Sequence, residues 1–243
     1  MRPSSTSPPP HSPPDLNPTV MKDTSSIAGG KLSDVTKDEW ALLRSRLTAA
    51  SVAGSDELGR FVSNTEFFKP SSFDERAAYP VLLDALPSLT DARLVAAVAG
   101  HLRRPWLRGD AFDVLRDAYL RWVPLDQITA WHLGETLASA SKAAQVSEVV
   151  ALVRDRRNGM ARQMLVLTLG RFRSSEEALS AADDLSADDD VALQALSSLR
   201  KLAGAERALS RAVEVAENHP GTRAADQAER EAKKLRKSLA SRR

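Results

Sequence analysis

The arginine side chains are the strongest candidates for a binding site in this sequence, because they are numerous and cluster in its central part. A guanidinium carries a planar fork of donors that suits carboxylate and phosphate oxygens. Tryptophans lie beside the arginines and add stacking surfaces. Nine arginines and three tryptophans lie near the ends of predicted helices in the central part of the chain: Arg103, Arg104, Arg108, Arg154, Arg156, Arg157, Arg162, Arg171, Arg173, Trp106, Trp122 and Trp131.

These residues have two interpretations. They could line a groove for a partner, or they could cap helix ends and pair with acidic residues of neighbouring helices. Interspersed acids favour the second interpretation: Asp84, Asp110, Asp113, Asp117 and Asp126. Our candidate partner-binding residues are Arg103, Arg104, Trp106, Trp131, Arg154, Arg157 and Arg162. We expect that changing Arg157 and Arg162 to Glu weakens partner capture and leaves thermal stability unchanged.

Carboxylates gather at Asp183–Asp184 and again at 188–190. A calcium loop needs alternating ligands, a glycine and a distant glutamate. Here three consecutive aspartates directly precede Val191 and no glycine is present, so we interpret them as negative charge at a helix N-terminus.

Other catalytic and metal-binding patterns are missing from the sequence. The four histidines show no i, i+4 pair, and there is no cysteine. Neither glycine-rich phosphate loop occurs, and Ala53-Gly54-Ser55 lacks supporting His and Asp residues. We therefore expect no enzyme activity, no metal and no cofactor.

The elements that must position these residues are helices in a repeat. Two apolar helical runs echo each other between Gly159 and Leu202, and each keeps the spacing of one buried helix face. At an offset of thirty residues, Leu165, Val166, Leu169 and Phe172 fall on Ala195, Leu196, Leu199 and Leu202. Helices that repeat a buried face at a period of 20–50 residues are typical of a solenoid.

Earlier units follow the same pattern less regularly. Gly100, Ala138, Gly170 and Arg200 occupy equivalent positions, at spacings of 38, 32 and 30 residues. Alanine and leucine dominate, and strand-like alternation is missing, so we predict an all-α fold.

The units resemble HEAT repeats of the short kind found in bacterial proteins related to phycobilisome-lyase repeats. The second helix of that repeat opens with an acidic turn, continues through a Val-Arg pair and an Ala-rich face, and ends in Leu-Gly. The matching residues are Ala161-Arg162, Leu169-Gly170, Asp190-Val191 with Leu199 and, in part, Ala99-Gly100. The fixed period and the Trp/Tyr/Pro pattern of tetratricopeptide repeats are not kept.

The resemblance implies a right-handed α-α superhelix of four to five helix pairs. We expect a disordered Pro/Ser-rich tail over 1–32, an N-terminal helical cap over 33–72, and HEAT-like repeats over 73–243 that end in a basic capping helix. The formal net charge is +2, and residues 222–243 alone carry +5. The translation start is open between Met1 and Met21.

The repeat architecture, more than any single motif, indicates the function of this chain. We expect a scaffold that binds another protein in a concave groove, works as a monomer in the cytoplasm and has no membrane segment. Two alternatives stay open. One is a nucleic-acid groove like that of the HEAT-like alkylpurine glycosylases, and the other is an accessory lyase or chaperone for a cofactor protein. The basic last helix is either a solvated cap or a contact for an acidic partner, nucleic acid or an anionic surface.

Overall fold

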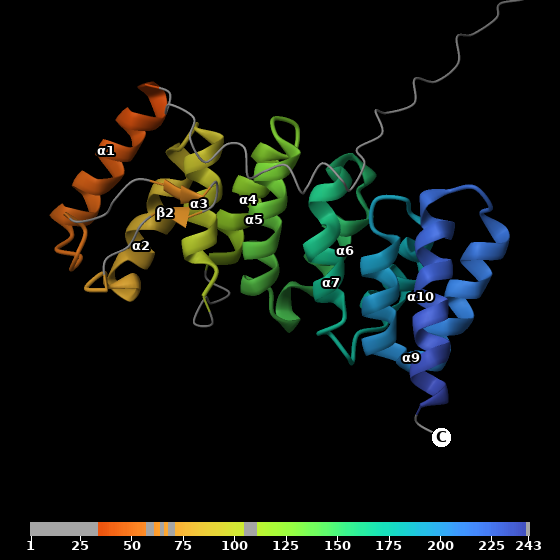
Figure 1. The fold of residues 1–243 in the computed structure, drawn as a ribbon. Coiled ribbons are helices and arrows are strands. Elements are labelled where there is room, and N and C mark those ends of the chain that lie inside the picture. The colour runs from red at the N-terminus through yellow and green to blue at the C-terminus, as the bar shows by residue number, and fades with distance from the viewer. Residues whose placement is uncertain (1–33, 57–60, 64–65, 68–70, 105–110, 242–243) are drawn as a thin grey trace, which may run out of the picture. The chain divides into compact units, whose positions relative to one another are not determined.

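The computed structural model describes residues 34–56, 61–63, 66–67, 71–104 and 111–241. Within these residues the fold is helical apart from one short pair of strands, which confirms the all-α prediction (Figure 1). The Pro/Ser-rich tail over 1–32, Trp106 and Arg108 lie outside the described residues. None of the described helices combines the length and the apolar character needed to cross a membrane.

Ten α-helices and four short 3-10 helices make up the described part of the chain. The α-helices are α1 (Asp34–Ala49), α2 (Glu75–Ala85), α3 (Ala92–Leu102), α4 (Phe112–Trp122), α5 (Gln127–Ala140), α6 (Val146–Arg154), α7 (Gln163–Leu169), α8 (Glu176–Asp184), α9 (Ala192–Asn218) and α10 (Arg223–Ala240). The 3-10 helices are η2 (Leu86–Ser88), η4 (Ala143–Gln145), η5 (Arg156–Arg162) and η6 (Leu185–Ala187).

The segment expected to be a helical cap contains more than helix. After α1, the strands β1 (Phe61–Ser63) and β2 (Glu66–Phe67) pair in antiparallel orientation. The Glu39 carboxylate of α1 accepts hydrogen bonds from the backbone N–H groups of Thr90 and Asp91, at 2.8 and 3.1 Å. A side chain of α1 thus satisfies free amides at the start of α3.

The helices from α2 onward form consecutive pairs. Each first helix contacts the second helix that follows it, in the pairs α2–α3, α4–α5, α6–α7 and α8–α9. The second helices also contact one another in turn, from α3 to α5, α5 to α7 and α7 to α9 (Figure 1). A row of second helices therefore connects the pairs.

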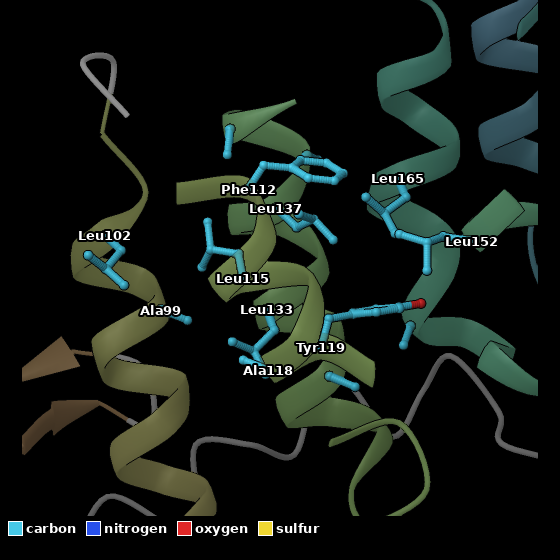
Figure 2. Close-up of a cluster of buried hydrophobic side chains, with 14 of the residues drawn as sticks. Ala99, Leu102, Phe112, Leu115, Ala118, Tyr119, Leu133, Leu137, Leu152 and Leu165 are labelled. Carbon is cyan, nitrogen blue, oxygen red and sulfur yellow. The ribbon is translucent and has the colours of Figure 1, made fainter. Parts of the chain in front are cut away.

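Apolar side chains from both helices of each pair meet in one core. Figure 2 shows side chains of α3, α4, α5, α6 and α7 converging around Leu115, Leu133 and Leu165. These three leucines are fully buried. Burying a leucine side chain contributes about 1.5–3 kcal/mol, so the contacts between pairs are a main source of stability.

Buried hydroxyl groups repeat at the contacts between second helices. Thr136 of α5 donates to the carbonyl oxygen of Ala99 in α3 at 2.8 Å, and Thr168 of α7 donates to that of Ala138 in α5 at 3.3 Å. Ser198 of α9 donates to the carbonyl oxygen of Val166 in α7 at 2.7 Å. The three hydroxyls lie 32 and 30 residues apart, the spacing that the sequence pattern predicts.

The long helix α9 consists of two helical segments that meet at a kink. Gly204 interrupts it with φ 89°, a conformation that favours glycine. Beyond Gly204, α9 packs against α10 through a smaller apolar cluster that includes Ala212, Val215 and Ala228. The C-terminal pair therefore has a thinner core than the central pairs.

Candidate partner-binding surface

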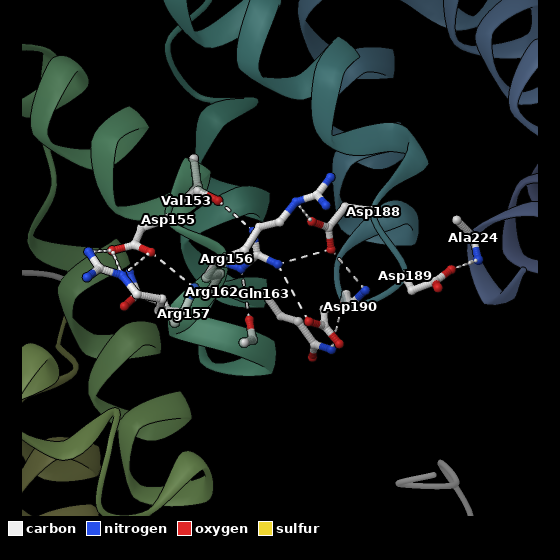
Figure 3. Close-up of polar contacts among 12 residues, drawn as sticks. Val153, Asp155, Arg156, Arg157, Arg162, Gln163, Asp188, Asp189, Asp190 and Ala224 are labelled. Atoms are coloured by element: carbon white, nitrogen blue, oxygen red, sulfur yellow. Dashed lines mark hydrogen bonds and ion pairs between the residues drawn. The ribbon is translucent and has the colours of Figure 1, made fainter. Parts of the chain in front are cut away.

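Arg162 lies at the end of η5 with a fully buried side chain. Its Nε donates to the carbonyl oxygen of Gly159 and its Nη1 to that of Val153, both at 2.9 Å. Its Nη2 donates to Oδ1 of Asp188 at 3.0 Å and lies 3.6 Å from Oδ2 of Asp190 (Figure 3). The guanidinium is thus engaged on all three nitrogens by its own chain.

The three aspartates before α9 have three separate structural roles. Asp188 is buried and pairs with Arg162, and Asp190 lies at the edge of the same guanidinium. Asp189 accepts a hydrogen bond at 2.7 Å from the backbone N–H of Ala224, at the start of α10 (Figure 3). The aspartates therefore connect η5, α9 and α10 and do more than add charge to one helix N-terminus.

The placement of Arg162 corrects its assignment as a partner-binding residue. A side chain that is 0% exposed cannot contact a partner at the surface. Removing one partner of a buried ion pair leaves an uncompensated charge and is strongly destabilising. The expectation that Arg162→Glu spares thermal stability is therefore wrong for this residue.

Arg157 lies close to Arg162 in sequence but has the opposite exposure. Its side chain is 90% exposed and forms a fork with the Asp155 carboxylate, with Nη2 to Oδ2 at 2.6 Å and Nε to Oδ1 at 2.9 Å. The hydrogen bonds from Arg157 lower the pKa of Asp155 below its ordinary value. Arg157 is accessible to a partner, but its fork already holds a carboxylate.

The other predicted arginines hold neighbouring helices together. Arg103 forms an ion pair with Glu135 of α5. Arg104 pairs with Glu75 of α2 at 2.7 Å, and Arg154 pairs with Asp184 of α8 at 2.8 Å. Arg103 and Arg154 thus pair with acids of a neighbouring unit, whereas Arg104 pairs within the α2–α3 unit.

A different set of residues forms a continuous surface along the second helices. At offsets of 32 and 30 residues, α5, α7 and α9 each place three partly or fully exposed side chains at equivalent positions. We call this surface the second-helix stripe. It consists of Trp131, His132 and Glu135 of α5, Gln163, Met164 and Leu167 of α7, and Leu193, Gln194 and Ser197 of α9.

Hydrogen bonds run along one edge of the second-helix stripe. Trp131 Nε1 donates to Oε1 of Gln163 at 3.3 Å, and Gln163 Nε2 donates to the carbonyl oxygen of Asp190 at 2.9 Å. The indole of Trp131 also meets the imidazole of His132 edge-on, at 5.1 Å between ring centroids. Trp131 is thus held in place while its ring stays partly exposed.

The stripe carries almost no charge. Burial lowers the pKa of His132, and the nearby Arg103 charge lowers it further while Asp126 opposes this change, so the imidazole is neutral at pH 7. Glu135 is neutralised by its ion pair with Arg103. The stripe therefore combines four apolar with five polar side chains, and its one charged side chain, Glu135, is paired, on a chain with 27% charged residues.

Of the seven predicted site residues, the structure brings only Arg103 and Trp131 to this surface. Met164, Leu167 and Leu193 are absent from the predicted site because charge and aromatic rings defined that site. The sequence does contain a signal for these residues. The repeat offsets of 32 and 30 residues relate half-buried positions of successive second helices, just as they relate buried ones. Among the described residues, no group of three or more His, Cys, Asp or Glu side chains could hold a metal ion.

Comparisons of the chain with protein-family models, with curated proteins and with solved structures found no match. The resemblance to HEAT repeats therefore rests on the residues of this sequence, and the surface must be interpreted from its own chemistry.

Proposed function

We propose that this chain is a non-catalytic scaffold of HEAT-like helix pairs, and that it binds another protein along the second-helix stripe. One observation carries the proposal. Three successive second helices place Trp131, Met164, Leu167 and Leu193 on the stripe, where the one charged side chain, Glu135, is paired with Arg103. Protein interfaces differ from other surfaces in having few charges at their centre and in enrichment of Trp and Met.

The ion pairs of the central arginines also favour a protein partner over nucleic acid. A nucleic-acid groove needs cations that are free to contact phosphates. Within the described residues the stripe contains no cation, and the neighbouring Arg103 holds Glu135. The partner that fits is a protein segment with bulky apolar side chains and few charges, such as an amphipathic helix laid across α5, α7 and α9.

Paired charge insertions test this assignment. The stripe variant is Leu167→Glu with Leu193→Glu, which places one carboxylate on α7 and one on α9. The control variant is Leu42→Glu with Leu120→Glu, which adds the same charge at side chains that are 61% and 43% exposed on α1 and α4. Both variants are checked for unchanged helix content and melting temperature by circular dichroism.

Affinity capture from lysate of the source cells, read by quantitative mass spectrometry, is the measurement. We expect a set of proteins that wild type and the control variant retain and the stripe variant loses. The proposal is wrong if the stripe variant, folded, captures the same proteins as wild type. It is also wrong if both variants lose the same proteins, because the loss then follows from added charge in general.

A further inference from the structure

The C-terminal helix α10 separates its residues into a buried apolar side and a cationic side. Ala224, Ala228, Ala232 and Leu235 are buried, and α10 packs on α9. Arg230, Lys233, Lys234 and Lys237 follow the i, i+3, i+4, i+7 spacing of one helix face, and all four are exposed. We call these four residues the basic face of α10.

Acidic residues neutralise the basic face only in part. Asp226 and Glu229 precede Arg230 and Lys233 by four residues, but within the described residues neither forms an ion pair with them. Glu231 is the one acid between Arg230 and Lys237, and it is 7% exposed. Its carboxylate lies 3.4 Å from Lys234 Nζ and 4.0 Å from the guanidinium of Arg200 in α9, so a fifth cation lies beside the face. Within the described residues, Arg230, Lys233 and Lys237 form no ion pair.

The surroundings of the basic face disfavour several kinds of partner. After Phe172 the sequence contains no Phe, Tyr or Trp, so single-stranded bases find no ring on which to stack. The apolar side of α10 is buried against α9 and cannot insert into a lipid surface. A protein partner would also lack the aromatic anchors that dominate binding energy.

We propose that the basic face of α10, with Arg200, binds the phosphate backbone of duplex nucleic acid without reading its sequence. Lysine and arginine contacts to phosphate need no aromatic or apolar support. The eight residues of helix from Arg230 to Lys237 span about 10 Å, a length over which a duplex carries about six phosphate charges. This activity is separate from the proposed protein scaffold, because the second-helix stripe contributes none of these residues.

Salt dependence gives the proposal a quantitative form. Each phosphate that a cation neutralises contributes about −0.9 to the slope of log affinity against log salt concentration. Four to five cations predict a slope of about −4 for this surface. Binding therefore weakens by more than about a hundredfold between 50 and 200 mM salt.

The test uses the full chain and a fluorescein-labelled mixed-sequence DNA duplex of about 20 base pairs, measured by fluorescence anisotropy. The basic-face variant carries R230Q, K233Q, K234Q and K237Q. The control variant carries R46Q, K142Q, R157Q and R173Q, so both variants lower the formal net charge of +2 by four. A third variant, K233R, K234R and K237R, retains every charge.

We expect wild type, the control and the charge-retaining variant to bind within about twofold of one another, and the basic-face variant to bind at least about tenfold more weakly. The proposal is overturned if wild type does not bind the duplex, or if the basic-face variant matches the control while circular dichroism shows it folded. It is also overturned if poly-glutamate or phosphatidylserine vesicles bind as tightly as the duplex at the same salt concentration. The stripe variant Leu167→Glu with Leu193→Glu should retain duplex binding, so failure of this proposal is distinguishable from failure of the scaffold proposal.

Discussion

The central arginines and the cations of α10 have the same charge and opposite surroundings. Between the helix pairs, Arg103, Arg154 and Arg162 each hold a carboxylate of another pair. On α10, Arg230, Lys233 and Lys237 extend from a helix whose neighbours leave them unneutralised. The difference shows that the number of cations in a sequence does not locate a binding surface, because the acids packed against them decide which cations remain free.

The largest effect should come from the most buried cation. Arg162→Met removes the closer of two cations from the buried Asp188 carboxylate, which keeps only its 3.4 Å contact with the exposed Arg156, and it frees two carbonyl groups, so we expect the free energy of unfolding to fall by about 3 kcal/mol. Urea unfolding measures it. Arg157→Met serves as the control and should leave the unfolding midpoint unchanged, because that side chain is 90% exposed. Equal effects of the two substitutions would remove the distinction between internal and surface arginines.

The second prediction compares alanine substitutions at two glycines, Gly134 in the closely packed centre and Gly204 in an open position near the C-terminus. A Cβ at Gly134 would lie 2.8 Å from the carbonyl oxygen of Ala161 and 3.3 Å from the Tyr119 ring. We expect Gly134→Ala to cost about 1–3 kcal/mol through overpacking. An added Cβ at Gly204 meets no atom within 4 Å. Its φ of 89° and ψ of 170° lie in a region that is essentially confined to glycine, so Gly204→Ala should cost about 1–3 kcal/mol through backbone strain alone.

Compensating mutations separate these two causes. Shortening the neighbouring ring by Tyr119→Leu should recover part of the loss caused by Gly134→Ala in a double-mutant cycle. No neighbouring substitution should recover the loss at Gly204. If the loss at Gly134 is fully additive with that at Tyr119, overpacking against the ring is not its cause.

Two buried hydroxyls in the central region should have effects of opposite sign. Thr136→Val removes the hydrogen bond to the Ala99 carbonyl oxygen and should lower the free energy of unfolding by about 1 kcal/mol. The hydroxyl of Tyr119 is buried and has no hydrogen-bond partner within the described part of the chain, and burial raises its pKa. Tyr119→Phe should therefore raise the free energy of unfolding by up to about 1 kcal/mol. The free energies of unfolding are measured in guanidinium chloride. If both substitutions change this free energy in the same direction, the assignment is contradicted.

The smallest effect concerns the pH dependence of the second-helix stripe. The pKa of His132 is lowered from 6.5 in the fold, chiefly by burial, so the unfolded chain takes up a proton at a higher pH than the folded chain. Stability that is present above about pH 6.5 is therefore lost as the pH falls toward 5. The variant His132→Gln should lack this part of the loss when urea unfolding is followed between about pH 7.5 and 5. An identical pH profile for the variant would exclude His132 as its origin.

The sequence predicted the helices well because their signals are local and repeated. The spacing of Leu165, Leu169, Ala195 and Leu199 follows one helix face, and all four side chains are buried in the structure. Gly204 breaks α9 with a non-helical backbone conformation two residues after Leu202, the last residue of the predicted repeat. The strand pair after α1 was missed because its strands of three and two residues are too short for a period to emerge.

The candidate site was harder to predict because its residues are defined by contacts between distant segments. Arg162 and Asp188 are 26 residues apart, and only packing of η5 against the start of α9 makes one neutralise the other. In sequence, Arg157 and Arg162 look equivalent. The stripe is also indistinct in sequence, because Leu167 and Leu193 are half-exposed leucines among many buried ones.

The central claim is that a partner binds the second-helix stripe and not the layer of first helices. The most direct measurement places a photoreactive benzoyl-phenylalanine at Leu193 on α9 or at Leu120 on α4, which are matched at 39% and 43% exposed. After irradiation in the source cells, we expect a cross-linked protein adduct from position 193 and none from position 120. Adducts from position 120 alone, or equal adducts from both positions, would contradict the account.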